Sequence, residues 1–471
     1  MHHIEQVYIN GEFVTPHGTE RFDLYNPATA RVIGQVRLAD AVDGERAIAA
    51  ARAAFPAWSK TTKQTRIAAL QRMHAAVAAR HDDLLEAVVE EYGAPASRSA
   101  WMASYPAEVI AQAIAALEAF EFTTVAGAAR VEMTPLGVAG LITPWNSDAG
   151  FICGKLAAAL AAGCTAVIKP SEMSALQTQI VTEALHAADL PPGVFNIVTG
   201  RGDTVGETIS RHPHVAKISF TGSTRTGKAI LRNAAENFTR VTLELGGKSP
   251  TLILDDADIK QAVPLAIQAG LMNSGQACVA GTRILVPQSR KAEFEQALAQ
   301  AIAAVKSGDP RDAKTVVGPM VSERQWQRVQ GYIQKGLAEG ARMLAGGVGR
   351  PEGTRDGWFV RPTLFTDVHN QMAIARDEIF GPVLCVITYR DEAEAIAIAN
   401  DTDYGLSALV LGGDSGRARC VAQQIHAGRV LVNTLTHEPK APFGGFKHSG
   451  VGREMGAWGI SAFMEPKTIL G

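Results

Sequence analysis

Cysteine is scarce in this chain, and no two cysteines form a closely spaced pair. Its 471 residues include five of them, at Cys153, Cys164, Cys278, Cys385 and Cys420. This spacing contains no CxxC pair and no disulfide framework, so we predict neither a metal site nor structural disulfides. Unpaired thiols persist in reducing compartments, which favours a cytoplasmic protein.

An excess of charge of either sign is also missing. Lys and Arg total 45 while Asp and Glu total 47, which gives a formal net charge of -2. Proteins that bind nucleic acid concentrate positive charge, so we predict no nucleic-acid partner. The first five residues lack the basic and then apolar pattern of a signal peptide.

No apolar stretch is suited to crossing a membrane. The segment closest to spanning length, 151–168, contains Lys155 and is rich in alanine, which gains little from entering hydrocarbon. We predict a buried helix followed by a strand there, and no membrane partner. Hydrophobic residues make up 46% of the chain and charged residues 20%, as in ordinary globular proteins, and the length predicts two large domains.

The chain does contain a repeated alternation of short apolar runs and helical segments. Predicted strands before residue 250 are 137–142, 166–168, 194–198, 215–220 and 241–245, and those after Cys278 are 283–286, 383–389, 407–411 and 429–433. Helical spacing marks 40–55, 61–92 and 391–400. The alternation predicts an α/β fold with two domains, the first built on a largely parallel sheet.

Two side chains indicate nucleophilic chemistry. Cys278 lies in the polar segment 273–279 (NSGQACV), and Glu244 lies upstream in 244–250 (ELGGKSP). A thiol with a carboxylate base can act as a covalent catalyst. Each residue alone also has a structural explanation. A buried cysteine packs as a small apolar residue, Glu244 could end a strand, and Asn146, after Pro144 and Trp145, could cap a turn.

Segment 222–229 (GSTRTGKA) almost matches a triphosphate-binding loop. Ala229 stands where such a loop needs a hydroxyl for Mg²⁺, which argues against a nucleotide triphosphatase. The segment still follows a predicted strand and opens a helix, whose free N–H groups can bind a pyrophosphate. Segment 168–172 (IKPSE) ends another strand, where a dinucleotide ribose usually lies.

Taken in order, these motifs resemble those of the aldehyde dehydrogenase superfamily, essentially from end to end. The matching segments are PWN at 144–146, IKPSE at 168–172, FTGST at 220–224, ELGGKSP at 244–250, GQAC at 275–278, EIFGP at 378–382 and PFGGFK at 442–447. The resemblance implies two Rossmann-like α/β domains and a small β oligomerisation element. The implied boundaries are 1–116 with 136–246 for the dinucleotide-binding domain, 247–448 for the catalytic domain, and 117–135 with 449–471 for an element that builds a homodimer or homotetramer.

The resemblance also implies the reaction, an NAD(P)-dependent oxidation of an aldehyde to a carboxylic acid. The Cys278 thiolate would attack the carbonyl carbon, while the Asn146 side chain and the Cys278 backbone N–H hold the oxyanion. Glu244 would activate the water that hydrolyses the resulting thioester, so water rather than coenzyme A is the expected acceptor. Lys155 would support the positioning of Glu244 or a proton relay.

The implied cofactor is NAD, held by ten residues. Lys169 and Glu172 would bind the adenosine ribose, and Glu378 the nicotinamide ribose. The carboxylate of Glu172 accepts from a ribose 2′-hydroxyl and repels a 2′-phosphate, although Lys169 and Ser171 leave room for NADP. The full set is Trp145, Lys169, Ser171, Glu172, Gly202, Gly222, Ser223, Leu245, Glu378 and Phe380, with Gly222 and Ser223 at the pyrophosphate.

The sequence leaves the aldehyde unnamed. Segment 147–150 (SDAG) and Gly154 stand where relatives carry bulky side chains, which predicts a wider or more polar substrate tunnel. Asp148 or Lys440 could bind a polar group of the substrate, and Met272, Ser274, Val279 and the loop 434–440 could line the tunnel. The hypothesis from another class is a non-catalytic dinucleotide-binding or structural protein that kept the fold.

Overall fold

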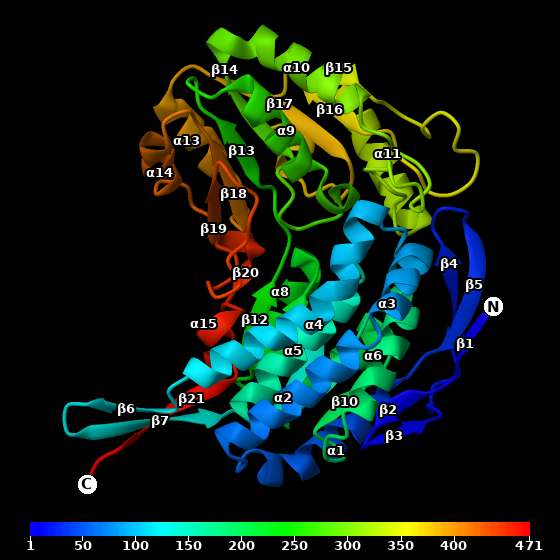
Figure 1. Ribbon diagram of the computed structural model, residues 1–471, viewed down its shortest axis with the longest axis vertical. Helices are drawn as coiled ribbons and strands as arrows, with labels where there is room; N and C mark the ends of the chain where they lie inside the picture. Colours follow the sequence, from blue (N-terminus) through cyan, green and yellow to red (C-terminus); the bar gives the residue numbers. More distant parts are fainter.

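A mixed eight-stranded sheet forms the core of one half of the protein, whose computed structural model describes all 471 residues (Figure 1). The strand order is β20-β12-β11-β8-β9-β10-β2-β3, and the central five strands are parallel. The chain winds outward in both directions from β8, and ligands of such sheets bind at the carboxyl ends beside this switch point. The strands are β2 (Val7–Ile9), β3 (Glu12–Val14), β8 (Val138–Ile142), β9 (Thr165–Lys169), β10 (Phe195–Ile197), β11 (Val215–Thr221), β12 (Arg240–Glu244) and β20 (Gly450–Val451).

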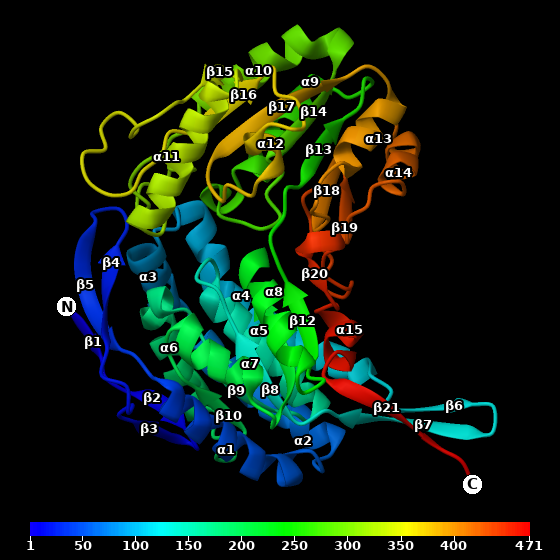
Figure 2. The same ribbon diagram turned by 180° about the vertical axis from the view of Figure 1, so that it is seen from behind.

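Helices cover both faces of this sheet (Figures 1 and 2). Buried residues of α2, α4, α5 and α6 pack on one face, and those of α1, α7 and α8 on the other. This double cover explains why strands β8 and β9 are buried at every position. The helices are α1 (Ala41–Trp58), α2 (Lys63–Ala78), α3 (His81–Ala87), α4 (Ala96–Ala119), α5 (Asp148–Ala162), α6 (Ala175–Ala187), α7 (Glu207–Arg211) and α8 (Thr224–Ala235).

A second sheet, of seven strands, forms the other half of the molecule, in the order β15-β16-β17-β14-β13-β18-β19. All neighbours are parallel except the β15–β16 pair. Its strands are β13 (Pro250–Ile253), β14 (Arg283–Pro287), β15 (Arg342–Ala345), β16 (Thr363–Thr366), β17 (Val383–Tyr389), β18 (Ser407–Leu411) and β19 (Arg429–Val432). Its helices are α9 (Ile259–Gly270), α10 (Lys291–Ala303), α11 (Glu323–Ala338), α12 (Ala373–Arg376), α13 (Glu392–Asn400) and α14 (Ser415–Ala422).

A three-stranded antiparallel arm projects from the body (Figures 1 and 2). It joins the hairpin β6 (Thr123–Ala126) and β7 (Ala129–Pro135) to the C-terminal strand β21 (Met464–Ile469), which follows α15 (Gly456–Ser461). Every residue of β6 is exposed. A further small sheet at the N-terminus contains β1 (His2–Ile4), β4 (Arg21–Asn26) and β5 (Arg31–Arg37).

The predicted fold class is confirmed, with differences in single elements. The helical spacing at 61–92 covers α2, α3 and a π-helical turn, η1 (Val88–Tyr92), because a new helix, α3, begins at His81, and the charges of Asp82 and Asp83 in its first turn suit a helix N-terminus. Strand β13 was not predicted, because it begins with a proline directly after the polar ELGGKS segment. The buried helix and strand predicted at 151–168 are α5 and β9. None of the helices combines the length and apolarity that a bilayer crossing requires.

Candidate active site

Four of the sequence motifs lie at the carboxyl edge of the eight-stranded sheet. Segment 143–146 follows β8, and Lys169 is the last residue of β9. Gly222 follows β11, and Glu244 ends β12. Because these strands are parallel, their ends meet at one edge, which is where open α/β sheets bind ligands.

The loop that carries Cys278 holds an unusual backbone conformation. Asn273, Ser274 and Gly275 have φ values of 54°, 59° and 75°, three left-handed residues in succession. Only glycine adopts this region freely, so the loop stores strain of the kind that clusters at functional sites. The Asn273 side chain restrains it by donating to the carbonyl oxygens of Asn146 at 3.1 Å and Gln276 at 3.2 Å.

Glycines allow three of the motifs to pack backbone against backbone. A Cβ atom on Gly247 would lie 2.3 Å from the Cys278 carbonyl oxygen, and one on Gly246 would lie 2.3 Å from Oε2 of Glu378. A Cβ atom on Gly275 would lie 2.3 Å from the Gly381 carbonyl. The segments 244–250, 275–278 and 378–382 are therefore in direct contact, which brings the predicted nucleophile and base into one site.

Glu244 is a buried carboxyl without a hydrogen-bond partner. Only 4% of the residue is exposed, and neither side-chain oxygen is bonded. Burial raises its pKa well above the usual value, Glu454 raises it further, and Lys155 opposes the shift. Buried carboxyl oxygens are nearly always satisfied, so an orphaned pair indicates a place for a reacting water or proton.

The Cys278 thiol is set apart from the other cysteines. Cys153, Cys164 and Cys385 are buried and Cys420 is exposed, whereas Cys278 is partly exposed. Burial of its sulfur, together with the nearby Glu378 and Glu244 carboxylates, raises the Cys278 pKa to about 12. The resting group is therefore a thiol, and its attack requires a base that removes the proton.

Asn146 presents its amide to the same loop. Its Nδ2 donates to the Gln276 carbonyl oxygen at 3.1 Å, two residues before Cys278. An amide nitrogen carries two N–H donors, so one remains for an oxyanion that develops next to the sulfur.

Lys155 does not contact Glu244. Its Nζ donates to Oε1 of Glu454 at 2.5 Å and to Oγ of Ser219 at 2.9 Å, and Ser219 donates to the same Glu454 oxygen at 2.8 Å. A direct hold on Glu244, one form of the predicted support, is therefore absent. Sequence reasoning missed Glu454, since a single acid between Arg453 and Met455 has no recognisable spacing.

At the end of β9, Glu172 lies between two cations. Its Oε2 lies 3.4 Å from Nζ of Lys169, and its Oε1 accepts from Arg201 at 3.2 Å. Burial disfavours the charged carboxylate, but Lys169 and Arg201 outweigh burial and hold the Glu172 pKa below its usual value. Arg201 was missed because only the fold brings it here. A Cβ atom on the next residue, Gly202, would meet no other atom within 4 Å, so this edge is open.

Helix α8 offers a capped N-terminus beside Gly222. Oγ of Ser223 accepts from the Thr226 N–H at 3.2 Å and caps the helix, so the Ser223 side chain is partly occupied. The Gly222 N–H donates to the Glu244 carbonyl at 3.0 Å, and Leu245 packs where a side chain on Gly227 would sit. The remaining free N–H groups of the first turn suit an anion.

Glu378 and Phe380 lie on the facing side, from the second sheet. Oε1 of Glu378 accepts from the Gly247 N–H at 3.0 Å, and burial raises the Glu378 pKa to about 7. The rings of Phe380 and Trp145 meet edge to face with centroids 5.4 Å apart. The predicted cofactor residues therefore come from both halves of the protein, which meet at the hydrogen bond between Glu378 and Gly247. Their donors, acceptors and apolar rings are of the kinds that bind a dinucleotide.

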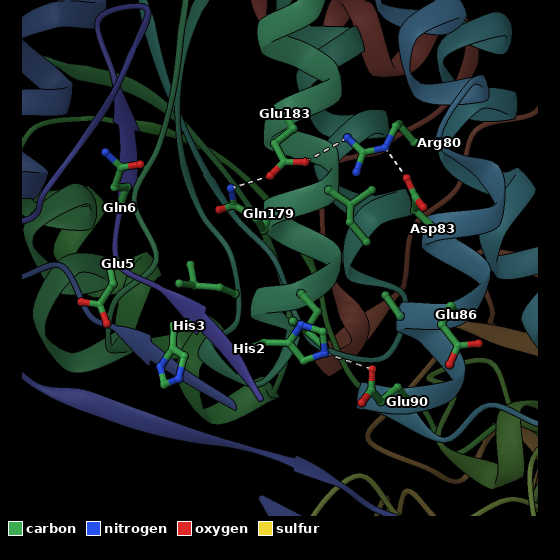
Figure 3. A pocket seen from close by; sticks show the side chains of 14 residues that line it. His2, His3, Glu5, Gln6, Arg80, Asp83, Glu86, Glu90, Gln179 and Glu183 are labelled. Carbon is green, nitrogen blue, oxygen red and sulfur yellow. Dashed lines mark hydrogen bonds and ion pairs between the residues drawn. The ribbon is translucent and has the colours of Figure 1, made fainter. Parts of the chain in front are cut away.

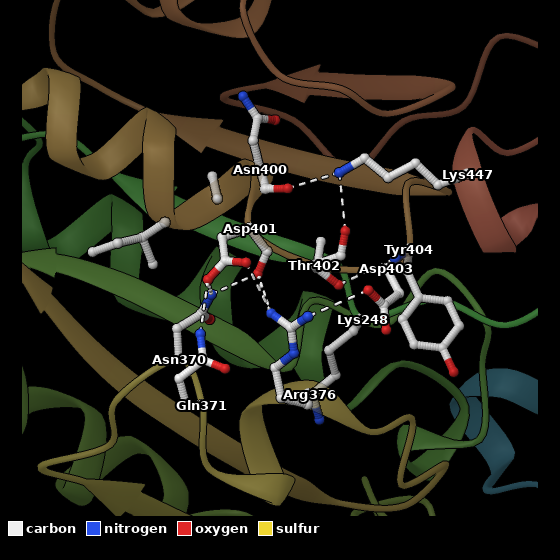
Figure 4. Close-up of polar contacts among 12 residues, drawn as sticks. Lys248, Asn370, Gln371, Arg376, Asn400, Asp401, Thr402, Asp403, Tyr404 and Lys447 are labelled. Atoms are coloured by element: carbon white, nitrogen blue, oxygen red, sulfur yellow. Dashed lines mark hydrogen bonds and ion pairs between the residues drawn. The ribbon is translucent and has the colours of Figure 1, made fainter.

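A polar network lies beside the segments 378–382 and 442–447 (Figure 4). Arg376, two residues before Glu378, pairs with Asp401 at 3.0 Å and Asp403 at 3.3 Å. Lys447, at the end of PFGGFK, donates to the carbonyls of Asn400 at 2.7 Å and Thr402 at 3.0 Å. Segment 400–403 therefore bonds to residues at or beside both EIFGP and PFGGFK, which fixes the positions of these two motifs relative to each other.

Two substrate-side predictions are wrong. Asp148 does not face a substrate, because it is fully buried and accepts from Thr143 at 2.7 Å and Thr178 at 2.8 Å, with burial raising its pKa to about 7. Ser274 is buried and accepts from the Gly318 N–H. A Cβ atom on Gly150 would lie 2.5 Å from the ring of Tyr105, which sequence reasoning missed. Gly150 and Gly154 nevertheless line, together with Tyr105, the cavity that also contacts Lys155 and Glu454, so the wider tunnel stays a prediction.

A groove lies away from these residues, at the N-terminal strand (Figure 3). It measures about 510 Å³, and its charged groups pair with one another, as in His2 with Glu90 at 3.3 Å and Arg80 with Glu183 at 3.0 Å. A cavity of about 90 Å³ lies between α4, α5 and the C-terminal segment, and its lining includes Lys155 and Glu454. Phe443 of PFGGFK also lines this cavity, whereas the groove at the N-terminal strand contacts none of these three residues.

Comparison with known proteins identifies relatives of this chain over nearly its whole length. Residues 13–469 match the model of the aldehyde dehydrogenase family. A 3-succinoylsemialdehyde-pyridine dehydrogenase from a Pseudomonas species is 43% identical over 473 residues, covering 100% of this chain and 99% of that protein. A mutant of aldehyde dehydrogenase C from Pseudomonas syringae, solved with NAD⁺ and octanal, superposes with a TM-score of 0.97 at 44% identity, covering 99% and 96% of the two chains. A Mycobacterium tuberculosis aldehyde dehydrogenase with NAD⁺ gives a TM-score of 0.96 at 38% identity, covering 99% and 98%.

Proposed function

From the membership of this chain in the aldehyde dehydrogenase family, we propose that it oxidises an aldehyde to a carboxylic acid with NAD, through a thioester on Cys278. One observation carries the catalytic assignment. A buried Glu244 carboxyl without any partner lies in a segment that packs on the Cys278 backbone.

In the first half of the reaction, Glu244 takes the thiol proton and the Cys278 sulfur forms a bond to the carbonyl carbon. The free N–H of the Asn146 amide and the backbone N–H of Cys278 stabilise the oxyanion of the thiohemiacetal. NAD, when bound, would accept the hydride that leaves this carbon. Cys278 then holds the acyl group as a thioester.

Before the second half, Glu244 releases the thiol proton to solvent and becomes a carboxylate again. It then takes a proton from a water molecule as that water attacks the thioester carbon. The carbon–sulfur bond breaks, the carboxylic acid leaves, and the sulfur recovers a proton. Lys155 acts on this step through charge rather than contact. Lys155 is held in place by Glu454 and Ser219, and the charges of Lys155 and Glu454 lower and raise, respectively, the pKa of Glu244.

The cofactor assignment rests on the charges, hydrogen-bond donors and aromatic rings of the predicted residues. Lys169, Ser171, Glu172 and Gly202 would hold the adenosine ribose. Gly222, Ser223 and Leu245 would form the pyrophosphate site at α8, and Trp145, Glu378 and Phe380 would enclose the nicotinamide ribose. The charged pair of Lys169 with Glu172, the open edge at Gly202 and the free turn of α8 support this arrangement.

The organisation of the chain is part of the proposal. We assign 1–116 with 136–246 to dinucleotide binding, 247–448 to catalysis, and 117–135 with 449–471 to a homodimer or homotetramer contact. The fully exposed β6 and the exposed Val125, at 78%, support a partner for the arm. All five cysteines are free, which supports a reducing cytoplasm.

The test is NADH formation from NAD across a panel of aldehydes without coenzyme A. Turnover by the wild type and none by Cys278→Ala, with NAD binding retained in both, is the expected result. A wild type that binds NAD but oxidises nothing would support the non-catalytic alternative. Equal turnover by both proteins would contradict the role of Cys278.

A further inference from the structure

The two buried arginines of this protein donate from every guanidinium nitrogen, whereas the half-buried Arg429 near the active site does not. The guanidinium of Arg283 donates to four acceptors, on Lys248, Asn370, Ile398 and Ala399. That of Arg66 donates to three, on Thr61, Ala161 and Ser59. Arg429 donates only from Nε, to Oγ of Ser407 at 3.1 Å, and forms no ion pair. A guanidinium has five N–H donors, so Arg429 keeps its terminal donors free.

Arg429 lies near both Phe443 and the loop that carries Cys278. It opens β19 and lies over the Phe443 ring at 5.6 Å, and Phe443 lines the cavity next to Lys155 and Glu454. Arg429 also borders a small cavity together with Met272 and Val279, the residue that follows Cys278. Its free donors are thus placed between the aromatic wall and the thiol loop.

No protein carboxylate neutralises this cation. Burial lowers the Arg429 pKa, and the Cys278 thiol is the titratable group that acts against this shift. The neighbouring His437 has its pKa lowered by burial and by Arg429, which keeps its ring neutral near pH 7. Glu438 is exposed and accepts from the Lys440 N–H instead. A partly desolvated cation with free donors is stabilised by an anion that enters with the substrate.

We propose that Arg429 binds a carboxylate at the far end of the aldehyde, so that the preferred substrates are semialdehydes of dicarboxylic acids. The inference rests on the proposed function and narrows its substrate class. The planar guanidinium can bind the two carboxylate oxygens side by side, which fixes the chain and directs the aldehyde carbon to Cys278.

A second under-bonded arginine provides a comparison. Arg98 on α4 makes no hydrogen bond, and its Nε is buried without a partner. Its guanidinium lies 3.7 Å from the centre of the Trp101 ring, so an aromatic face covers it closely. The looser Arg429–Phe443 contact leaves the Arg429 donors accessible.

The experiment compares kcat/KM for ω-carboxy aldehydes of four to eight carbons with kcat/KM for their methyl esters. Each pair differs in charge at one end, so their ratio cancels effects on the thiol. The proteins are wild type, Arg429→Gln, Arg429→Lys, Arg98→Gln and Arg350→Gln. Arg350 is the matched control, because it lies over Trp326 at 4.9 Å and donates to the Gly357 carbonyl away from the site.

The wild type should prefer the carboxylate at one chain length. Arg429→Gln should lower the carboxylate-to-ester ratio on the order of tenfold to a hundredfold, as for loss of a charge-assisted bond. Arg429→Lys should fall between the two, which also guards against misfolding of the glutamine variant, and Arg350→Gln should keep the wild-type ratio. An unchanged ratio in both Arg429 variants, or a loss in Arg98→Gln alone, overturns the inference while ester turnover upholds the proposed function. No turnover of any aldehyde overturns both.

Discussion

The Glu378 carboxylate accepts a hydrogen bond from the backbone N–H of Gly247 at 3.0 Å, across 131 residues of sequence. Gly247 also abuts the carbonyl of Cys278. One contact therefore ties a proposed cofactor ligand to the loop that follows Glu244 and to the loop of the nucleophile. The proposed cofactor site and the thiol site therefore share Gly247 as a common contact. A substitution of Glu378 should affect both NAD binding and the position of the Cys278 loop.

Glu378→Gln should weaken NAD binding on the order of tenfold, because the amide keeps an acceptor for Gly247 but loses the charged acceptor for a ribose hydroxyl. Binding is measured by titration in a Cys278→Ala background, which separates it from turnover. Glu394→Gln, on the exposed side of α13, is the control. Equal NAD affinity in the Glu378 variant and its parent would rule out the ribose role.

Cofactor choice should depend on Glu172. Glu172→Gln removes the anion between Lys169 and Arg201, and both cations then become available for a 2′-phosphate. We expect the NADP-to-NAD ratio of kcat/KM to rise about tenfold or more. Adding Arg201→Gln should reverse part of that rise. A ratio that stays at the wild-type value in Glu172→Gln would refute this placement of the adenosine ribose.

The pH dependence of turnover should shift in opposite directions in two variants. Glu454 raises the Glu244 pKa and Lys155 lowers it. Glu454→Gln should therefore move the acidic limb of the deacylation rate to lower pH, and Lys155→Met should move it to higher pH. The profiles are recorded under conditions where thioester hydrolysis limits turnover. Shifts of the same sign, or none, would exclude the proposed electrostatic action of this pair.

Much of the site could be predicted from the sequence because its residues occupy strand ends. Glu244 and Lys169 end two parallel strands, so their meeting at one edge follows from fold class alone. Cys278 was distinguished by its polar, glycine-containing segment, and the left-handed residues Asn273 to Gly275 explain that composition.

The remaining contacts depend on tertiary packing that leaves no local pattern. Lys155 and Glu454 are 299 residues apart, so no local sequence pattern predicts that they form a pair. A carboxylate such as that of Asp148 could bind a polar substrate. At the start of α5, however, it accepts a hydrogen bond from Thr178 on α6 instead. Tyr105 fills the space beside Gly150 from a separate helix, which no count of small residues near Asn146 could reveal.

Asp148 should make stability depend on pH. Its pKa of about 7 in the folded protein exceeds the usual unfolded value of about 3.9. The folded state therefore holds the proton more tightly, and the associated stability, complete below about pH 4, is lost as the pH rises toward 7. Each pH unit in this window costs at most about 1.4 kcal/mol.

Asp148→Asn does not titrate, so its unfolding free energy relative to wild type should increase from pH 4 to pH 7 and then level off. Urea denaturation at several pH values measures the difference. Asp391→Asn, an exposed helix cap on α13, is the comparison. A difference that stays constant across the window would show that Asp148 is already ionised in the folded protein.

The proposed mechanism is tested most directly by trapping the thioester. Glu244→Gln keeps the shape of the side chain but removes the base, so hydrolysis should slow by on the order of a hundredfold or more. Glu244 is also the base assigned to the thiol, so the experiment is run at a pH high enough for hydroxide to take the Cys278 proton in its place. Rapid mixing with NAD and aldehyde should then yield one NADH per subunit. Mass spectrometry of the quenched protein should then find the acyl group on the peptide that contains Cys278. A burst of NADH without an acyl group on Cys278, or steady turnover at the wild-type rate, would contradict the mechanism.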